Sequence, residues 1–94
     1  MSFIDDVREA VLAVPAGSVA SYGDIGGRIG VGPRQVGRAM SLLDENVPWW
    51  RVVHADGTPS TCHDGRAPEL LSGEATPMCG TRVDMQRARY RWTP

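Results

Sequence analysis

Lysine is absent from this sequence, cysteine is scarce and no long apolar run occurs. All ten basic residues are arginine, for which a GC-rich coding sequence is the simplest explanation. With only Cys62 and Cys79 present and no export signal, we expect reduced thiols rather than a disulfide framework. No apolar stretch approaches the roughly 20 residues of a membrane span. The first residues are acidic and lack the basic start and apolar core of a signal peptide, so we expect a cytoplasmic protein without a membrane partner.

A strong charge of one sign is also missing. The 94 residues carry a formal net charge of −1, with 41% hydrophobic and 22% charged residues, which is ordinary for a globular chain. A chain of this length predicts a single domain over residues 1–94. Because phosphate affinity comes chiefly from cationic contacts, the near-neutral charge argues against a general nucleic-acid binder. Any binding to DNA must then rest on a local patch.

Residue types that bind metals are present, but their spacing is not that of a metal site. His54, Cys62, His63 and Cys79 could nominally supply four zinc ligands. A structural zinc site usually pairs ligands about two to four residues apart, and this set matches no standard pattern. We therefore expect no metal and no cofactor, but scattered thiols and surface histidines.

The first half of the chain has the pattern of three helices. Apolar residues that recur on one face predict a helix over residues 2–14. Ser21, followed three residues later by Asp24, has the arrangement of a capping box and predicts a second helix, which stops at Gly30-Val31-Gly32. Pro33 suits the first turn of a third helix, with an apolar stripe over residues 36–43. Two short helices joined by a glycine-bearing turn are a helix-turn-helix pattern.

The second half of the chain predicts a wing. We expect a strand over residues 50–54, a turn at Asp56-Gly57 and a second strand over residues 58–60. A proline near its start and a glycine at its end predict a short helix over residues 66–73. Residues 74–94 should be irregular or stranded. The expected fold class is therefore mainly α with a small β-hairpin, a winged helix-turn-helix.

Two segments carry a resemblance to a known family. Pro48-Trp49-Trp50-Arg51-Val52-Val53 lies just beyond Tyr22 and Arg34-Gln35-Val36-Gly37-Arg38-Ala39-Met40. Together they resemble the DNA-binding domain of the O6-alkylguanine-DNA alkyltransferases, whose enzymes have Pro-Cys-His-Arg-Val and use the Cys to accept the alkyl group. Trp49 stands at the position of that Cys, and Trp50 stands at the position of the His that activates it. Because an indole has no thiolate to alkylate, the chain resembles an alkyltransferase-like protein with the fold of that domain.

The resemblance implies DNA-binding roles for Tyr22, Arg34, Gln35, Gly37 and Arg38. The helix that carries Arg34 would enter the minor groove, and the Arg34 guanidinium would fill the space that a flipped nucleotide leaves. Gly37 would allow a close approach to the DNA, and Tyr22 would hydrogen-bond a phosphate. From the residues alone, Arg34 and Arg38 could equally form a solvated pair on one helix face. Gly37 could serve helix packing, and Tyr22 could be a partly buried aromatic.

The lesion pocket that the resemblance implies contains Trp49, Tyr22, Arg51 and Arg66. An indole is the broadest aromatic wall for a base held outside the duplex, so we assign Trp49 to the pocket and Trp50 to its support. The alternative is that both are core tryptophans. Arg51 would buttress the pocket loop with its five donors. Arg66 is the nearest candidate for the arginine that relatives have in the opposite wall.

Two further features have more than one interpretation. Cys62-His63 looks like the Cys-His pair of the enzymes, but no Pro precedes it and Asp64-Gly65 replaces Arg-Val. The last thirteen residues are locally basic, because only Asp84 offsets four arginines: Arg82, Arg87, Arg89 and Arg91. These arginines could contact phosphates or a protein partner, or they could form a solvated tail.

The resemblance implies a non-enzymatic sensor of O6-alkylguanine in double-stranded DNA. Such a protein would act as a monomer, flip the lesion into its pocket and flag the site for the damage-recognition proteins of nucleotide excision repair. Three alternatives are a winged-helix regulator, an active methyltransferase that uses Cys62 or Cys79, and a protein-interaction module. Neither cysteine has a sequence context that would activate it.

Overall fold

The computed structural model describes residues 3–43, 46–61 and 63–91, and its helices and strands are short. The helices are α1 (Phe3–Leu12), α2 (Tyr22–Ile29), α3 (Pro33–Met40), α4 (Ala67–Gly73) and α5 (Met85–Ala88). The strands are β1 (Ala20–Ser21), β2 (Val52–Val53), β3 (Met78–Cys79) and β4 (Arg82–Val83), and two 3-10 turns are η1 (Trp49–Arg51) and η2 (His63–Gly65). The fold is mainly helical with small sheets, which confirms the predicted fold class.

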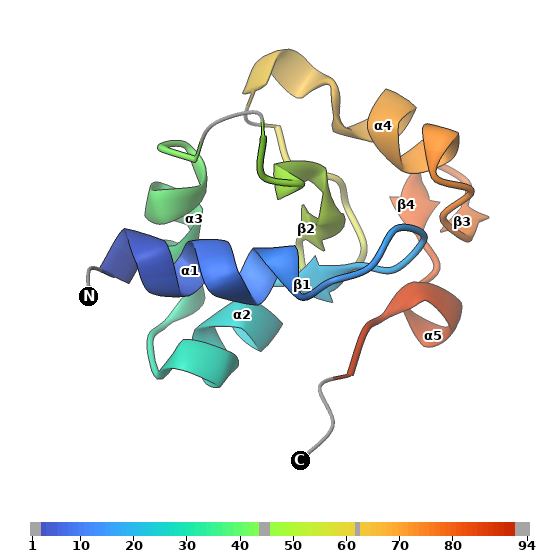
Figure 1. The fold of residues 1–94 in the computed structure, drawn as a ribbon. Coiled ribbons are helices and arrows are strands. Elements are labelled where there is room, and N and C mark those ends of the chain that lie inside the picture. Colours follow the sequence, from blue (N-terminus) through green and yellow to red (C-terminus); the bar gives the residue numbers. More distant parts are fainter. Residues whose placement is uncertain (1–2, 44–45, 62, 92–94) are drawn as a thin grey trace.

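Figure 1 shows how these elements are arranged around the centre of the molecule. The helices α1, α2 and α3 group at one side, the β3–β4 hairpin lies with α4 and α5 at the other, and β1 and β2 lie between them. The core forms where Val7, Val11, Ile25 and Met40 pack around Trp49, and each of these side chains is at most 1% exposed. Among the described residues, no helix is both long enough and apolar enough to cross a membrane.

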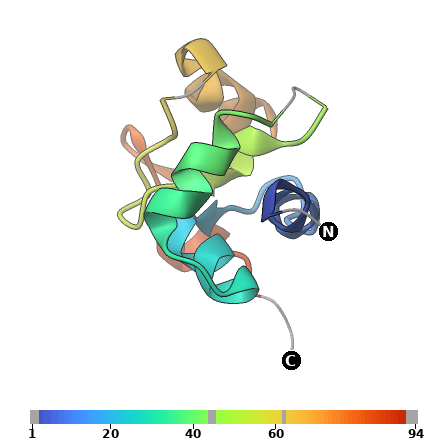
Figure 2. The same ribbon diagram turned by 90° about the vertical axis from the view of Figure 1, so that its left-hand side faces the viewer.

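The helix-turn-helix forms where its sequence signals predict it. The Ser21 hydroxyl accepts a hydrogen bond from the Asp24 N–H at 3.0 Å, and the Asp24 carboxylate accepts one from the Ser21 N–H at 3.1 Å, which completes the capping box. Gly30 ends α2 in a left-handed conformation with φ of 84°. Pro33 then begins α3, which lies on the side of the molecule that faces the viewer in Figure 2.

A parallel strand pair, which the sequence did not predict, joins the two halves of the chain. Ala20 pairs with Val52 and Ser21 pairs with Val53. The chain between them includes the whole helix-turn-helix, so the pairing is a long-range contact. Two-residue strands carry no alternating pattern, so the sequence contains no strand signal before Ser21.

The predicted wing is only partly stranded. The prediction of a strand over residues 50–54 is wrong at its start, because the Arg51 N–H donates to the Pro48 carbonyl oxygen and closes the turn η1. Beyond the turn, the second predicted strand is reduced to one bridge between Val53 and Pro59. Proline has no N–H to donate, so the ladder cannot extend through that residue.

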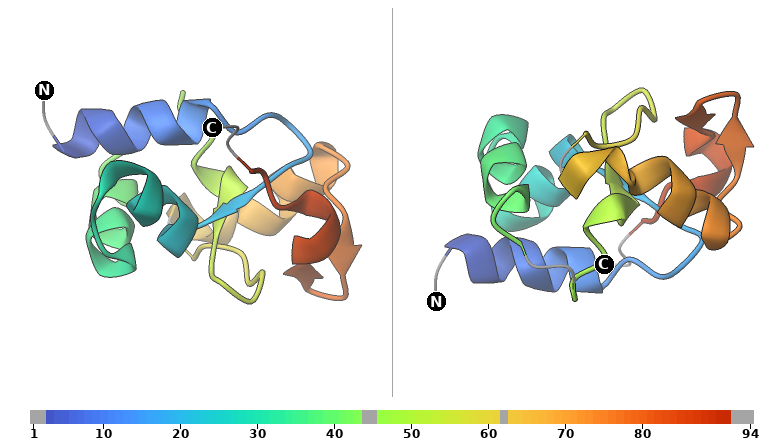
Figure 3. Two further views of the ribbon diagram at one scale, coloured as in Figure 1. Left: turned by 90° about the horizontal axis from the view of Figure 1, so that it is seen from below. Right: turned by 90° about the horizontal axis from the view of Figure 1, so that it is seen from above.

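The C-terminal part is more ordered than the expected irregular or stranded structure. The strands β3 and β4 form an antiparallel hairpin, and the Asp84 carboxylate caps the following helix α5 by accepting the Gln86 N–H at 3.1 Å. The Val83 N–H donates to the Gly57 carbonyl oxygen at 2.8 Å, which connects the hairpin to the turn after β2. Seen from below in Figure 3, α5 and this hairpin lie on the opposite side of β1 from α3.

Two adjacent glycines of α2, Gly26 and Gly27, allow a matched test of how closely the following turn packs on the helix. A Cβ on Gly26 would lie 2.4 Å from the Val31 carbonyl oxygen, whereas a Cβ on Gly27 would meet no atom within 4 Å. We expect Gly26→Ala to lower the free energy of unfolding by about 1–3 kcal/mol, because the turn must shift. Gly27→Ala should raise it by about 0.5–1 kcal/mol. Urea unfolding followed by circular dichroism measures both, and equal stability of the two variants would contradict the close approach.

Candidate nucleic-acid interface

A cleft of about 440 Å³ opens where the start of α2, the helix α3 and the turn after β2 meet. It is lined by Tyr22, Gly23, Pro33, Arg34, Gly37, His54 and Ala55. The structure thus brings together three of the residues that the sequence assigned to DNA binding, Tyr22, Arg34 and Gly37. The other expected pocket residues, Trp49, Arg51 and Arg66, do not line this cleft.

Tyr22 forms one wall of the cleft and is held at both ends. Its hydroxyl donates to the Ser60 hydroxyl at 2.8 Å, and its ring centroid lies 5.0 Å from that of His54. A Cβ on Gly37 would lie 3.9 Å from the Tyr22 ring, which is ordinary contact distance, so glycine leaves room there without being sterically required. No local sequence signal connects His54 and Ser60 with Tyr22, since they reach it only through the tertiary fold.

The exposed side of α3 carries the predicted arginines. Arg34 and Arg38 are exposed and one helical turn apart, so both are available to a phosphate backbone. Gln35 is exposed too, but its carboxamide oxygen accepts the Gly32 N–H at 2.9 Å. Gln35 therefore caps the start of α3, a structural role that the resemblance did not imply.

Trp49 lies in the core, while Trp50 is only partly buried. The Trp49 side chain is 1% exposed, and its indole is covered by the imidazole of His63, with centroids 4.3 Å apart and planes inclined by 12°. The His63 Nε2 lies 2.9 Å from the Leu43 carbonyl oxygen, which can only accept, so this nitrogen carries the proton. In this state of the molecule, the face of Trp49 that a base could stack on is occupied by His63.

The backbone that carries His63 is strained. His63, Asp64 and Gly65 follow one another with φ values of 56°, 63° and 68°. This left-handed conformation costs a residue other than glycine roughly 1–2 kcal/mol. The stack on Trp49 and the bond to Leu43 hold the ring in this arrangement against that cost.

Arg51 supports the core from a half-buried position and makes no wall of the cleft. Its Nη1 donates to the Val14 carbonyl oxygen at 2.9 Å, and its Nε donates to the Glu74 carboxylate at 2.9 Å. The guanidinium also lies 5.7 Å from the Trp50 ring centroid. Hydrogen bonds from Arg51 outweigh the effect of burial and hold the pKa of Glu74 below its ordinary value of 4.5. Arg51 thus ties the end of the first helix to the end of α4.

The remaining candidates lie outside the cleft. Arg66 is exposed and donates from Nε to the His63 carbonyl oxygen at 3.3 Å, so it contacts the segment that covers Trp49. Cys79 is exposed in the β3–β4 hairpin, and Cys62 lies outside the described residues. Within the part of the chain that the structure describes, no three His, Cys, Asp or Glu side chains gather into a group that could hold a metal ion.

Two of the C-terminal arginines are paired with acidic residues. Arg82 lies 3.6 Å from the Asp56 carboxylate in an exposed ion pair, and Arg89 pairs with Asp24 at the start of α2. The interpretation of this segment as a wholly solvated tail is therefore wrong for these two residues.

The fold and the cleft define a class of protein, a helix-turn-helix domain that presents an arginine-bearing helix beside an aromatic cleft. Residues 2–76 match the family model described as "6-O-methylguanine DNA methyltransferase, DNA binding domain". The chain belongs to this family. It is 37% identical to the DNA base-flipping protein of Escherichia coli (strain K12), over 97% of this chain and 74% of that protein. It is 32% identical to Alkyltransferase-like protein 1 of Schizosaccharomyces pombe, over 98% of this chain and 95% of that protein.

Solved structures agree with this assignment. The S. pombe Atl1 structure in complex with damaged DNA containing O6-carboxymethylguanine superimposes with a TM-score of 0.81 at 30% identity, over 98% of this chain and 95% of Atl1. The Mycobacterium tuberculosis OGT structure in complex with DNA gives a TM-score of 0.74 at 33% identity, over 80% of this chain but only 49% of that one. The predicted resemblance to alkyltransferase-like proteins is confirmed.

The Arg51–Glu74 pair predicts a pH-dependent contribution to stability. Because the pKa of Glu74 is lowered in the folded state, the pair stabilises the fold above pH 4.5, and this contribution is lost as the pH falls through the folded-state pKa. We expect Glu74→Gln to lower the free energy of unfolding by about 1–2 kcal/mol at neutral pH, and by less at about pH 3.

Denaturant unfolding at the two pH values measures this difference. Glu69→Gln, at an exposed glutamate on the same helix α4, is the matched control and should leave stability nearly unchanged at both. A Glu74→Gln protein that lost the same free energy at both pH values would contradict the role of the ion pair.

Proposed function

We propose that this protein binds double-stranded DNA, rotates an O6-alkylguanine out of the helix and recognises it without removing the alkyl group. The observation that carries the proposal is the convergence of Tyr22, Arg34 and Gly37 on one cleft. The names of two relatives, DNA base-flipping protein and alkyltransferase-like protein, support the same reading.

The cleft supplies the parts that extrusion of a base requires. Arg34 is exposed on α3, and its flat cation can fill the gap left in the duplex. Tyr22 presents a phenol to the same cleft, where it can exchange its bond to Ser60 for a phosphate oxygen. Arg38 lies one turn further along the helix and adds a cation for the backbone. This local arrangement can act on DNA even though the whole chain has a net charge of −1.

Alkyl transfer lacks an acceptor at the position where the family's enzymes have one. Trp49 stands there, and an indole offers no thiolate to attack an alkyl carbon. Cys79 lies in the β3–β4 hairpin and does not line the cleft. We therefore propose binding without repair, followed by transfer of the site to nucleotide excision repair proteins, with the chain acting as a monomer.

Trp49 can serve a flipped base only if His63 leaves its face. The imidazole lies on the indole in the parallel geometry that a stacked base would adopt. We propose that the extruded base takes the place of this ring, with Arg66 near the displaced segment through its bond to the His63 carbonyl. Trp49 would then be both a core residue and the wall that meets the lesion.

The proposed function predicts lesion-selective binding without transfer. With duplexes that differ by a single O6-methylguanine, we expect a preference of at least about fivefold for the damaged one, the lower end of what stacking on an aromatic provides. A radiolabel on the methyl group should remain on the DNA. Label found by peptide mass on Cys62 or Cys79 would overturn the non-enzymatic reading and revive the methyltransferase alternative.

A matched pair of arginine variants controls for bulk charge. Arg34→Ala should abolish most of the lesion preference, whereas Arg8→Ala, which removes an exposed arginine from α1 outside the cleft, should retain it. Equal lesion preference in both variants would show that Arg34 is not the residue that fills the gap in the duplex.

The variant His63→Ala tests whether the imidazole covers the face of Trp49 that the extruded base would contact. Removal of one ring stack and one hydrogen bond should raise affinity for the O6-methylguanine duplex by about three- to tenfold, because the base no longer displaces the imidazole. Affinity for the undamaged duplex should not change. Fluorescence anisotropy on labelled duplexes measures both, and weaker binding of the lesion would show that His63 is a wall of the pocket and not its cover.

A further inference from the structure

The C-terminal segment returns to the start of the helix-turn-helix. The Val19 N–H donates to the Ala88 carbonyl oxygen at 2.9 Å, and the Tyr90 N–H donates to the Val19 carbonyl oxygen at 2.7 Å. These bonds form a parallel bridge between Val19 and Arg89, and both Val19 and Ala88 are buried. The backbone of residues 88–90 is thus fixed beside the residue that precedes β1.

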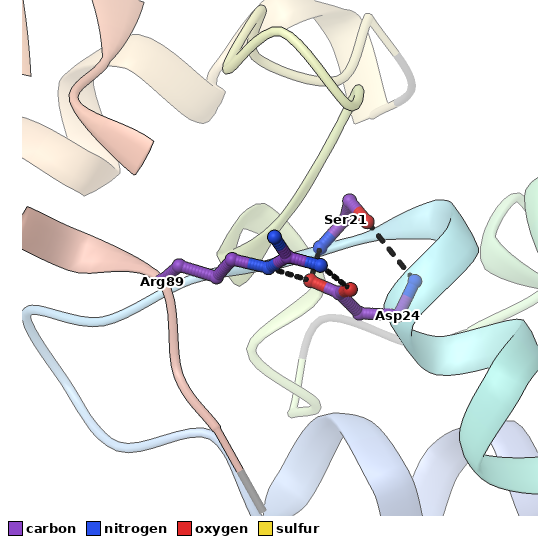
Figure 4. A network of polar contacts seen from close by, with 3 residues as sticks. All are labelled: Ser21, Asp24 and Arg89. Atoms are coloured by element: carbon purple, nitrogen blue, oxygen red, sulfur yellow. Dashed lines mark hydrogen bonds and ion pairs between the residues drawn. The ribbon is translucent and has the colours of Figure 1, made fainter. Parts of the chain in front are cut away.

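From this position the Arg89 side chain reaches the first turn of α2 (Figure 4). Its Nε donates to Asp24 Oδ2 at 2.9 Å, and its Nη2 forms a second bond to Asp24 Oδ1, so the pair is bidentate. The same Oδ2 accepts the Ser21 N–H, and the Ser21 hydroxyl accepts the Asp24 N–H. Arg89 therefore orients the carboxylate on which the capping box depends.

The charge of Arg89 is largely committed to this contact. Burial alone would raise the pKa of Asp24, but the hydrogen bonds from Arg89 and Ser21 outweigh it and lower the pKa. The same contact raises the pKa of Arg89. Two of the five donors of the Arg89 guanidinium are thus bonded to this carboxylate.

The residue that this network surrounds is Tyr22. It lies between Ser21 and Asp24 in the chain, and its ring lines the cleft that faces the DNA in the proposed function. A small rotation of the first turn would move the phenol away from its target, and site geometry of this kind must be held within about 0.5 Å.

We propose that Arg89 is a positioning residue for Tyr22, which holds the first turn of α2 in the orientation needed to extrude the damaged base. The proposal rests on the proposed function and extends it to a residue outside residues 2–76, the range that the family model matches. It separates Arg89 from the arginines that would act on DNA directly.

The experiment compares Arg89→Ala, Arg89→Lys and Arg87→Ala with the parent. Arg87 is an exposed arginine on α5 and provides the matched removal of charge. Each protein is titrated with undamaged duplex and with duplex carrying one O6-methylguanine at several salt concentrations. Thermal unfolding is measured in parallel, and amide exchange of Ser21 and Asp24 is followed in the free proteins.

We expect Arg89→Ala to lose about fivefold of the lesion preference and to exchange the Ser21 and Asp24 amides about fivefold faster, the scale of a weakened helix cap. Its affinity for undamaged duplex and its salt dependence should match those of the parent. Arg89→Lys should have a lesion preference and amide exchange rates between those of the parent and of Arg89→Ala, because lysine keeps the charge but not the bidentate geometry. Arg87→Ala should retain the parent's lesion preference and amide exchange.

Two results would overturn the proposal. Arg89→Ala could lose the same affinity for both duplexes, and the slope of its log affinity against log salt concentration could become shallower by about one. Arg89 would then be a phosphate contact. An unchanged lesion preference in a folded but less stable Arg89→Ala protein would make the contact purely structural. A parent without lesion preference would instead refute the proposed function, and the amide exchange would then decide by itself whether Arg89 orders the first turn.

Discussion

The parallel pairing of Ala20 and Ser21 with Val52 and Val53 is the contact on which the candidate site depends. All four residues are buried, so their backbone hydrogen bonds are protected from water. Tyr22 directly follows β1 and His54 directly follows β2, so the two residues lie side by side where the strand pair ends. Their ring centroids are 5.0 Å apart. Two adjacent rims of the cleft thus come from one short piece of sheet. A change that separated the strands would open the cleft and detach the first turn of α2 at once.

The parts of the fold that sequence could predict are those with local signals. Ser21 and Asp24 mark a helix start, Pro33 marks another, and both helices lie where these residues place them. The pairing of β1 with β2 could not be foreseen, because it joins two-residue segments far apart in the chain. For the same reason the sequence placed Tyr22 and Arg34 in the site but gave no sign of His54.

Trp49 shows that a sequence motif does not predict how its residues pack. The motif led us to expect Trp49 at the position of the acceptor, and aromatic chemistry suggested a pocket wall. The side chain is instead enclosed in the core, with the Trp50 ring edge-on at 5.7 Å and the His63 imidazole stacked on its face. In the proposed function, packing and recognition fall on the same residue, so a substitution there should alter both.

The bond between Arg89 and Asp24 also orders events during synthesis of the chain. The two residues are 65 positions apart, and Arg89 leaves the ribosome after Asp24. Local helices form within microseconds, whereas translation adds about 5–20 residues each second. The helix-turn-helix therefore spends several seconds with its capping carboxylate lacking a cation. Until Arg89 has been made, the Asp24 carboxylate lacks its guanidinium partner, so one of the last segments to be synthesised completes a contact at one of the first.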